Sequence, residues 1–180
     1  ELIRNAKKKG IQITADVAIH NLILDDNKCA DFDSLYKVFP PLRQKSDIKA
    51  LIKGLKDGSI DAICSDHTPD DVEHKNREFD NASFGIIGLQ TAFSLACQLE
   101  KELTLETIIS KLAIEPRKIL GLDVPNIAKD QKANFFCYQL GKNWSLKVED
   151  IVSKSKNTPF TEQELSHQIM GVVYGNENSF

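Results

Sequence analysis

The sequence lacks the features that mark membrane proteins and nucleic-acid-binding proteins. Its 180 residues contain no apolar run that approaches the roughly 20 residues of a membrane-spanning helix, and they show no signal-peptide pattern. The formal net charge is -3, with 23 basic and 26 acidic residues, so there is no basic excess to attract a nucleic acid. We therefore expect a cytoplasmic protein that binds neither a membrane nor a nucleic acid.

Cysteine and methionine are also scarce. The cysteines are scattered without CxxC pairs, which is typical of reduced thiols in the cytoplasm, and we expect Cys64 and Cys97 in the core. The only methionine is Met170, and Glu1 already lies inside a helical pattern that has no N-cap. We therefore expect the chain to be the carboxyl-terminal part of a longer protein.

The sequence does contain alternating helix and strand patterns. Strands are expected at residues 11–18 and 60–64. Helices are expected at residues 1–9, at 47–56 with Ser46 as N-cap, at 85–102, after Thr104, and from Pro116 to Gly121. This order is typical of parallel βα units, so the predicted fold class is α/β.

The last third of the chain has a different character. Strand patterns occur at residues 133–140, 144–148 and 167–174, with no long helical pattern between them. They predict a small β layer, so we divide the chain into residues 1–125 and residues 126–180.

Residues 60–88 carry the polar groups that a strand end would present. The apolar run at residues 60–64 predicts a buried parallel strand, and residues 65–67, SDH, follow at its carboxyl end. In α/β barrels and open sheets, chemistry is assembled at this end of the strands. The polar loop that follows closes on FGIIG at residues 84–88.

Several motifs together resemble dihydroorotases of the amidohydrolase superfamily. In order, they are a lysine before PPLR (residues 37–43), an Asp and an ALxxGLxDGxID run (47–61), SDHxP (65–69), a lysine (75) and FGIIGL (84–89). NTPF at residues 157–160 also fits the carboxyl-terminal region of the family. The agreement of several motifs makes the resemblance more specific than SDHxP alone would.

The resemblance implies a (β/α)8 TIM barrel with a small β-sandwich built from both chain ends. This chain would supply the last two barrel strands, at residues 11–18 and 60–64, the closing helices within residues 1–125, and part of the sandwich within residues 126–180. The implied partners are a small-molecule substrate and further copies of the protein in a homo-oligomer, with aspartate transcarbamoylase as a candidate.

The implied reaction is the zinc-dependent, reversible hydrolysis of dihydroorotate to N-carbamoyl-aspartate in pyrimidine biosynthesis. Asp66 matches the aspartate after the last barrel strand of the family, so it is expected to be a metal ligand and the catalytic group that moves a proton from the nucleophilic water to the leaving nitrogen. Zinc lowers the pKa of a bound water to about 7, and a neighbouring carboxylate can carry its proton. The backbone of Phe84 and Gly85 matches substrate-binding positions.

The resemblance places most zinc ligands before residue 1. With Asp66 as the one expected ligand, we predict that the isolated chain binds no catalytic zinc tightly and is inactive, because a zinc site needs three or four ligands. For His20, at a strand end, we favour a hydrogen-bonded wall residue over a metal ligand. We also expect a solvated acidic loop at residues 70–74 rather than a metal cluster with His67, and an exposed helix end at residues 7–9.

Four positions depart from the pattern of the family. They are Asn21 for a histidine, Phe39 for a substrate-binding asparagine, Asp70 for a histidine that contacts the substrate, and Gln90 for a glutamate. Phe39 offers no hydrogen bond, and the carboxylate of Asp70 would repel an anionic substrate. These changes leave two alternatives open: a catalytically degenerate dihydroorotase-like subunit with a structural or partner role, and an allantoinase.

Overall fold

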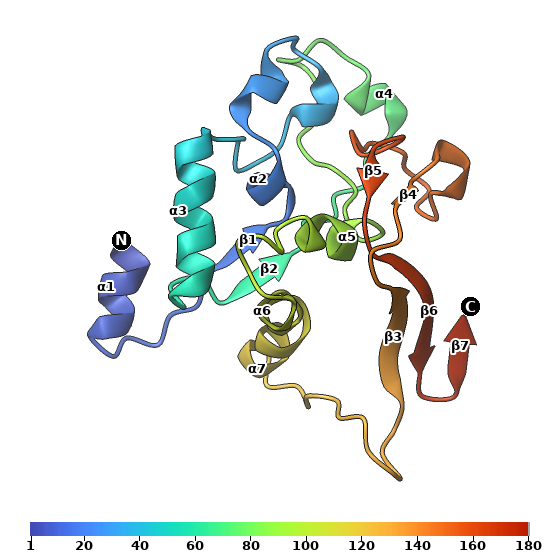
Figure 1. The fold of residues 1–180 in the computed structure, drawn as a ribbon. Helices are drawn as coiled ribbons and strands as arrows, with labels where there is room; N and C mark the ends of the chain where they lie inside the picture. The colour runs from blue at the N-terminus through green and yellow to red at the C-terminus, as the bar shows by residue number, and fades with distance from the viewer. Residues whose placement is uncertain (180) are drawn as a thin grey trace.

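The computed structural model describes residues 1–179, which form a mixed α/β part followed by a part built of antiparallel strands (Figure 1). The helices are α1 (Leu2–Lys8), α2 (His20–Ile23), α3 (Lys45–Lys56), α4 (Val72–Lys75), α5 (Ala92–Cys97), α6 (Leu105–Ile109) and α7 (Glu115–Ile119). The strands are β1 (Asp16–Ala18), β2 (Ala62–Cys64), β3 (Asn134–Gln139), β4 (Trp144–Ser145), β5 (Glu164–Leu165), β6 (Gln168–Tyr174) and β7 (Glu177–Ser179). Within these residues, no helix combines the length and the apolar character that crossing a bilayer requires.

Strands β1 and β2 lie side by side and parallel, with Val17 opposite Ile63. This pair confirms the predicted α/β class. The first strand is shorter than expected, however, because residues 11–15 lie outside it. Ile11 is 55% exposed, and none of residues 11–15 is buried, so this segment does not pack into the core as a strand would. The N–H of Ala15 donates to the carboxylate of Asp61 instead of to a neighbouring strand.

Helix α3 packs against this pair through Ile52 and Leu55, which are buried. The helix predicted at residues 47–56 is therefore confirmed, but its predicted N-cap is wrong. The helix begins at Lys45, and Gln44 takes the N-cap position without a side-chain capping bond. Ser46 lies inside the first turn.

The helix predicted at residues 85–102 is present only at Ala92–Cys97, so the prediction is wrong at both ends. Helix α5 begins only at Ala92, because residues 85–88 are not helical and residues 89–91 form a turn. Ile86 forms a parallel β-bridge with His67, and the N–H of Gly88 donates to the Nδ1 atom of His67. These contacts with the distant residue His67 therefore hold Ile86 and Gly88 out of a helix.

The helical region after α5 agrees with the sequence. Thr104 caps α6 by accepting a hydrogen bond from the N–H of Thr107 at 3.3 Å. A π turn at Ser110–Ile114 then joins α6 to α7, which has Pro116 in its first turn. Pro116 has no backbone N–H to donate, and it lies just after this π turn, where the regular helical hydrogen-bond pattern is already interrupted.

The carboxyl-terminal third forms a β3–β6–β7 antiparallel sheet and a β4–β5 pair. The three strands predicted there are present, each with shorter bounds. Four residues of this third are buried in the same hydrophobic core as the α/β part: Leu146, Ile151, Phe160 and Leu165. The sheet itself extends away from α1 and α3 (Figure 1). The domain boundary after residue 125 stays a prediction.

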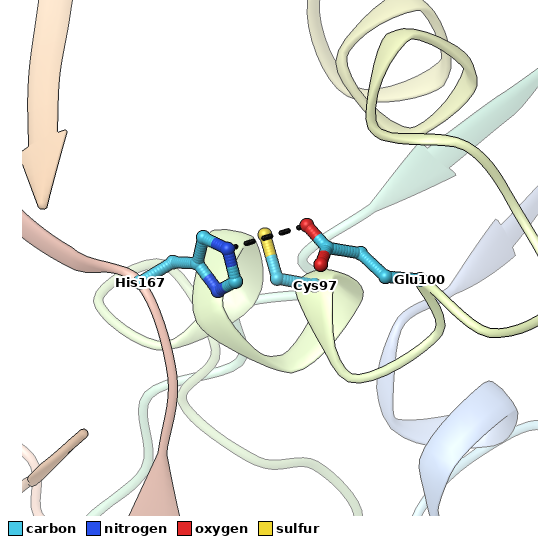
Figure 2. Close-up of side chains that lie close together, drawn as sticks. All are labelled: Cys97, Glu100 and His167. Atoms are coloured by element: carbon cyan, nitrogen blue, oxygen red, sulfur yellow. Dashed lines mark ion pairs between the residues drawn. The ribbon is translucent and has the colours of Figure 1, made fainter. Parts of the chain in front are cut away.

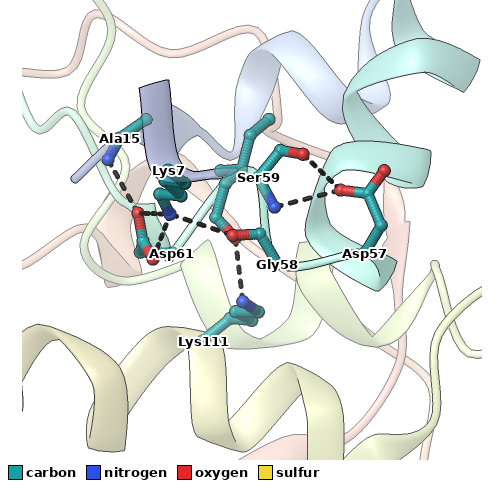
Figure 3. A network of polar contacts seen from close by, with 8 residues as sticks. Lys7, Ala15, Asp57, Gly58, Ser59, Asp61 and Lys111 are labelled. Atoms are coloured by element: carbon teal, nitrogen blue, oxygen red, sulfur yellow. Dashed lines mark hydrogen bonds and ion pairs between the residues drawn. The ribbon is translucent and has the colours of Figure 1, made fainter. Parts of the chain in front are cut away.

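A polar network ties α1 to the amino-terminal end of β2 (Figure 3). The ammonium of Lys7 lies 2.6 Å from both carboxylate oxygens of Asp61 and donates to the carbonyl of Gly58. Although burial raises the pKa of Asp61, hydrogen bonds from Lys7 and Ala15 hold it below its usual value. Lys7 is thus a half-buried anchor, and the expectation of an exposed helix end is correct only for Lys8 and Lys9.

Candidate functional site

Two polar side chains meet where β1 and β2 end. The N–H of Ile19 donates to the carbonyl of Cys64, which extends the pairing by one step beyond the strands. His20 then follows β1, and Asp66 follows β2. The Nε2 atom of His20 lies 3.7 Å from Oδ2 of Asp66. Neighbouring parallel strands end at the same edge of a sheet. His20 and Asp66 therefore lie close together, because each follows the carboxyl end of its strand.

His20 is almost fully buried, yet its Nε2 atom has no hydrogen-bond partner among the described residues. Burial lowers the pKa of His20, and the nearby charge of Asp66 only partly opposes that effect. The imidazole is therefore neutral at neutral pH. A neutral ring nitrogen with a free lone pair is the form in which histidine binds metals.

Asp66 has a left-handed backbone conformation, with φ of 45°. For a residue other than glycine, such a conformation costs on the order of 1–3 kcal/mol and persists only where the surroundings enforce it. The hydroxyl of Thr68 donates to the carbonyl of Asp66 at 3.1 Å. The side chain of Asp66 is 36% exposed, so its carboxylate faces the open rim rather than apolar packing.

His67 holds the next segment against the strand ends. Its Nδ1 atom accepts hydrogen bonds from the N–H groups of Gly88 and Leu89, at 3.2 and 3.4 Å. The ring proton is therefore placed on Nε2. A side chain at Gly88 would collide with the carbonyl of Ser65, so the contact also requires a glycine there.

Phe84 and Gly85 lie beside this rim. Gly85 has φ of 116°, and a Cβ atom there would lie 2.5 Å from the side chain of Thr68. Its N–H donates to the carbonyl of Lys37 at 2.9 Å, so packing already explains the glycine. The ring of Phe84 is half exposed and meets the ring of Phe39 edge to face at 5.9 Å.

Lys75 and Asn157 fix the loops around Phe84. Lys75 is 3% exposed, and its ammonium donates to the carbonyls of Lys37 and Ser83. Burial lowers the pKa of Lys75 to about 8. The amide of Asn157 donates to the carbonyls of Thr68 and Gly85. The lysine and the NTPF motif noted in the sequence thus have a structural role that the sequence did not reveal.

Two of the four departures serve internal contacts. The buried amide of Asn21 donates to the carbonyls of Pro40 and Pro41, both at 3.4 Å. Gln90 donates to the carbonyl of Asp150 and accepts from the N–H of Val152. Both side chains form neutral links between segments.

The other two departures, Phe39 and Asp70, lie in the loops around this rim. Phe39 is 71% exposed. Hydrogen bonds from Ser83 and His74 hold the pKa of Asp70 below its usual value, so its carboxylate is ionised. Its Oδ1 atom lies 3.1 Å from Nδ1 of His74, a residue that is itself mostly exposed. This agrees with the solvated loop expected at residues 70–74.

One further group of donor side chains lies apart from this rim. In the part of the chain that the structure describes, Cys97, Glu100 and His167 form the one cluster of three or more potential metal ligands with closely spaced donor atoms (Figure 2). The burial expected for Cys97 is confirmed, whereas Cys64 is only half buried. No pattern in the sequence had singled out this group.

Comparisons with known proteins identify relatives of the chain. No protein-family model matches it. It is 41% identical over 163 residues to a curated dihydroorotase of Acetivibrio thermocellus, covering 89% of this chain and 38% of that protein. It is 42% identical over 177 residues to the dihydroorotase of Caldicellulosiruptor saccharolyticus, covering 96% of this chain and 41% of that protein. The chain thus spans about two-fifths of the length of these relatives.

Solved structures show the same fold at lower sequence identity. The L-hydantoinase of Arthrobacter aurescens matches with a TM-score of 0.89 and 20% identity, over 98% of this chain and 41% of that protein. The inactive dihydroorotase-like domain of the Chaetomium thermophilum CAD-like multifunctional protein matches with a TM-score of 0.70 and 22% identity, over 98% of this chain and 46% of that one. The predicted resemblance is confirmed, and the fold is that of part of such amidohydrolases.

Proposed function

We propose that this chain, a relative of the dihydroorotases, is the carboxyl-terminal part of a zinc-dependent dihydroorotase barrel. The β1–β2 pair has no further strand on either side among the described residues. Parallel sheets are normally covered on both faces. A groove of about 550 Å³ runs beside the pair, with Ala62, Leu112 and Ile119 in its lining. Further barrel strands and helices would pack in these places.

The residues at the rim fit a zinc ion. The Nε2 atom of His20 and the carboxylate of Asp66 are both zinc donors, and the buried nitrogen has no other partner among the described residues. Two tetrahedral ligands, each about 2.1 Å from an ion, lie roughly 3.4 Å apart. The observed 3.7 Å is close to that spacing. We therefore assign His20 as a ligand, in place of the wall residue favoured from the sequence.

This assignment revises the expected ligand count. The chain would supply two ligands rather than Asp66 alone, which is still one or two short of a zinc site. The remaining ligands would come from other parts of the whole protein. The prediction that the isolated chain binds catalytic zinc only weakly, and is inactive, therefore stands.

In the proposed reaction, Asp66 accepts a proton from the attacking water and delivers it to the ring nitrogen that leaves the carbonyl carbon. Bound zinc would supply a water molecule acidic enough to react at neutral pH. Neutral His20 adds no positive charge of its own beside Asp66. The backbone at Phe84 and Gly85 would border the substrate, held in place by Lys75 and Asn157. The spacing of His20 and Asp66 is the observation that carries this proposal.

A catalytically degenerate subunit is the second candidate. The exposed ring of Phe39 and the ionised carboxylate of Asp70 favour it, because neither would bind a carboxylate substrate. Such a subunit would support a homo-oligomer or aspartate transcarbamoylase. Either protein would be cytoplasmic, in accord with the biosynthetic role of the named relatives.

Assays of the whole protein with zinc separate these candidates. Conversion of dihydroorotate and carbamoyl aspartate into one another supports the enzyme, and the absence of turnover in both directions supports the degenerate subunit. Hydrolysis of allantoin without hydrolysis of dihydroorotate would identify an allantoinase instead.

A further inference from the structure

Cys97, Glu100 and His167 gather where α5 meets the start of β6 (Figure 2). Cys97 is the last residue of α5, and Glu100 lies three positions later, so both side chains extend from one side of the same turn. His167 arrives from the segment just before β6. One donor atom from each residue lies within 4.8 Å of the other two.

The imidazole of His167 is buried without a hydrogen-bond partner. The residue is 5% exposed, and neither ring nitrogen has a hydrogen-bond partner among the described residues. Oε1 of Glu100 lies 3.3 Å from Nε2, which is within ion-pair distance (dashed in Figure 2), but the contact does not have the geometry of a hydrogen bond. A buried polar group is normally satisfied, so these free nitrogens indicate a ligand between the three side chains.

The surroundings hold His167 in position for a ligand. Its backbone is left-handed, with φ of 59°, and its carbonyl accepts a hydrogen bond from the hydroxyl of Ser94. The indole N–H of Trp144 donates to the same hydroxyl at 3.2 Å. The rings of Phe93 and Tyr138 pack against the imidazole, with centroids at 6.5 and 5.9 Å. These contacts fix the backbone of His167 and the position of its ring.

We propose that Cys97, Glu100 and His167 bind a divalent transition-metal ion of the zinc class. Thiolate, imidazole and carboxylate donors together suit zinc or cobalt, and the thiolate disfavours calcium and magnesium. Binding converts the Cys97 thiol to a thiolate, and its proton leaves to solvent. Two anionic donors then balance the charge of the ion. The partly exposed carboxylate of Glu100 gives the ion a path from solvent and leaves a fourth position for water.

The ion would join two parts of the chain that are far apart in sequence. Helix α5 belongs to the α/β part, whereas β6 is the central strand of the carboxyl-terminal sheet. A bound ion stabilises the folded state, because the unfolded chain does not hold the three donors together. This site shares no residue with the rim formed by His20 and Asp66, so it would be separate from the proposed catalytic centre.

Cobalt binding to the whole protein tests this proposal. The catalytic site would bind cobalt through histidine and carboxylate ligands only, whereas the proposed site includes a thiolate. A thiolate ligand produces a thiolate-to-cobalt charge-transfer absorption in the near ultraviolet. We expect this absorption in the wild type and its loss in Cys97→Ser. Cys64→Ser and Cys137→Ser are the matched controls and should retain it. Its absence from the wild type, or its retention in Cys97→Ser, would overturn the proposal.

Glu100→Gln keeps the test decisive if Cys97→Ser fails to fold. Glu100 lies at the surface, so the variant should show the circular dichroism of the wild type. We expect its cobalt affinity at the thiolate site to fall about tenfold or more. We also expect zinc to raise the Tm of the wild type more than that of this variant. Equal affinities and equal Tm shifts would contradict the assignment.

Discussion

The Nε2 atom of His20 lies 3.7 Å from the Oδ2 atom of Asp66, although 46 positions separate the two residues in the chain. The parallel pairing of β1 and β2 creates this contact, since each residue follows the carboxyl end of its strand. One partner is a buried neutral base and the other is an open carboxylate. The proposed chemistry depends on that difference.

His20→Gln should remove a zinc ligand from the whole protein. We expect the zinc bound at the rim to be lost and dihydroorotase turnover to fall about 100-fold or more, because metal-assisted attack depends on a complete ligand set. Metal analysis and steady-state kinetics measure both effects. His74→Gln changes an exposed histidine of the neighbouring loop and should leave both near the wild-type values. Full zinc content and turnover in His20→Gln would rule out the ligand role.

His20 should also make the stability of the metal-free protein depend on pH. Burial lowers the pKa of His20 in the folded state, so near pH 6.5, the ordinary pKa of histidine, only the unfolded chain takes up this proton. Above pH 6.5 the titration of His20 therefore does not reduce the free energy of unfolding. Below that pH the free energy falls, by at most about 1.4 kcal/mol per pH unit from this group. Urea unfolding should show a shallower acid loss for His20→Gln, and identical pH slopes would contradict a buried neutral imidazole.

Lys75 should have an influence of the same sign at alkaline pH. Burial lowers its pKa to about 8, whereas an unfolded lysine titrates near 10.5. Between these values the unfolded chain binds more protons, so the contribution of Lys75 to stability rises with pH, by about 3 kcal/mol in all. Lys75→Met should lack this rise. The difference between the two unfolding curves isolates it from other groups, and a pH-independent difference would contradict the buried ammonium.

Lys7→Met tests the anchor of α1. It removes the ion pair with Asp61 and leaves a partly buried carboxylate with one fewer donor. We expect a loss of about 1–2 kcal/mol in the free energy of unfolding. Lys8→Met, on the exposed side of the same helix, should change stability by less than about 0.5 kcal/mol. Equal effects of the two substitutions would show that the network in Figure 3 does not contribute.

Phe39→Asn and Asp70→His test the two departures at the rim. If they weaken substrate binding, the double variant should lower the KM for dihydroorotate, because it adds hydrogen-bond donors and removes a negative charge beside an anionic substrate. A tenfold change corresponds to about 1.4 kcal/mol. An unchanged KM, or a higher one, would show that these positions do not contact the substrate. Gln90→Glu, at a departure used for an internal contact, is the control.

The sequence predicted the features that depend on local pattern. Strand β2, helix α3 and the Thr104 cap follow from apolar spacing and capping chemistry, and residues 65–67 were correctly placed at a strand end. His20 was also placed at a strand end. Its burial and its free ring nitrogen could not be predicted, because they depend on how distant segments pack over it.

The errors arise from contacts between distant segments. Residues 85–91 have a helical pattern, but Nδ1 of His67 accepts hydrogen bonds from the N–H groups of Gly88 and Leu89, and the helix begins only at Ala92. Cys97 and His167 are 70 positions apart, so no spacing motif could have connected them. The spacing of Cys97 and Glu100 on one helical turn was visible, but it is too common to indicate a metal site by itself.

Turnover of dihydroorotate by the whole protein, compared between wild type and Asp66→Asn, tests the central claim most directly. With zinc present, we predict conversion in both directions by the wild type and a loss of about 10²–10⁴-fold in Asp66→Asn, as expected when a general acid–base group is removed. Asp71→Asn, a carboxylate of the adjacent loop, should retain the wild-type rate. Wild-type turnover in Asp66→Asn would contradict the account.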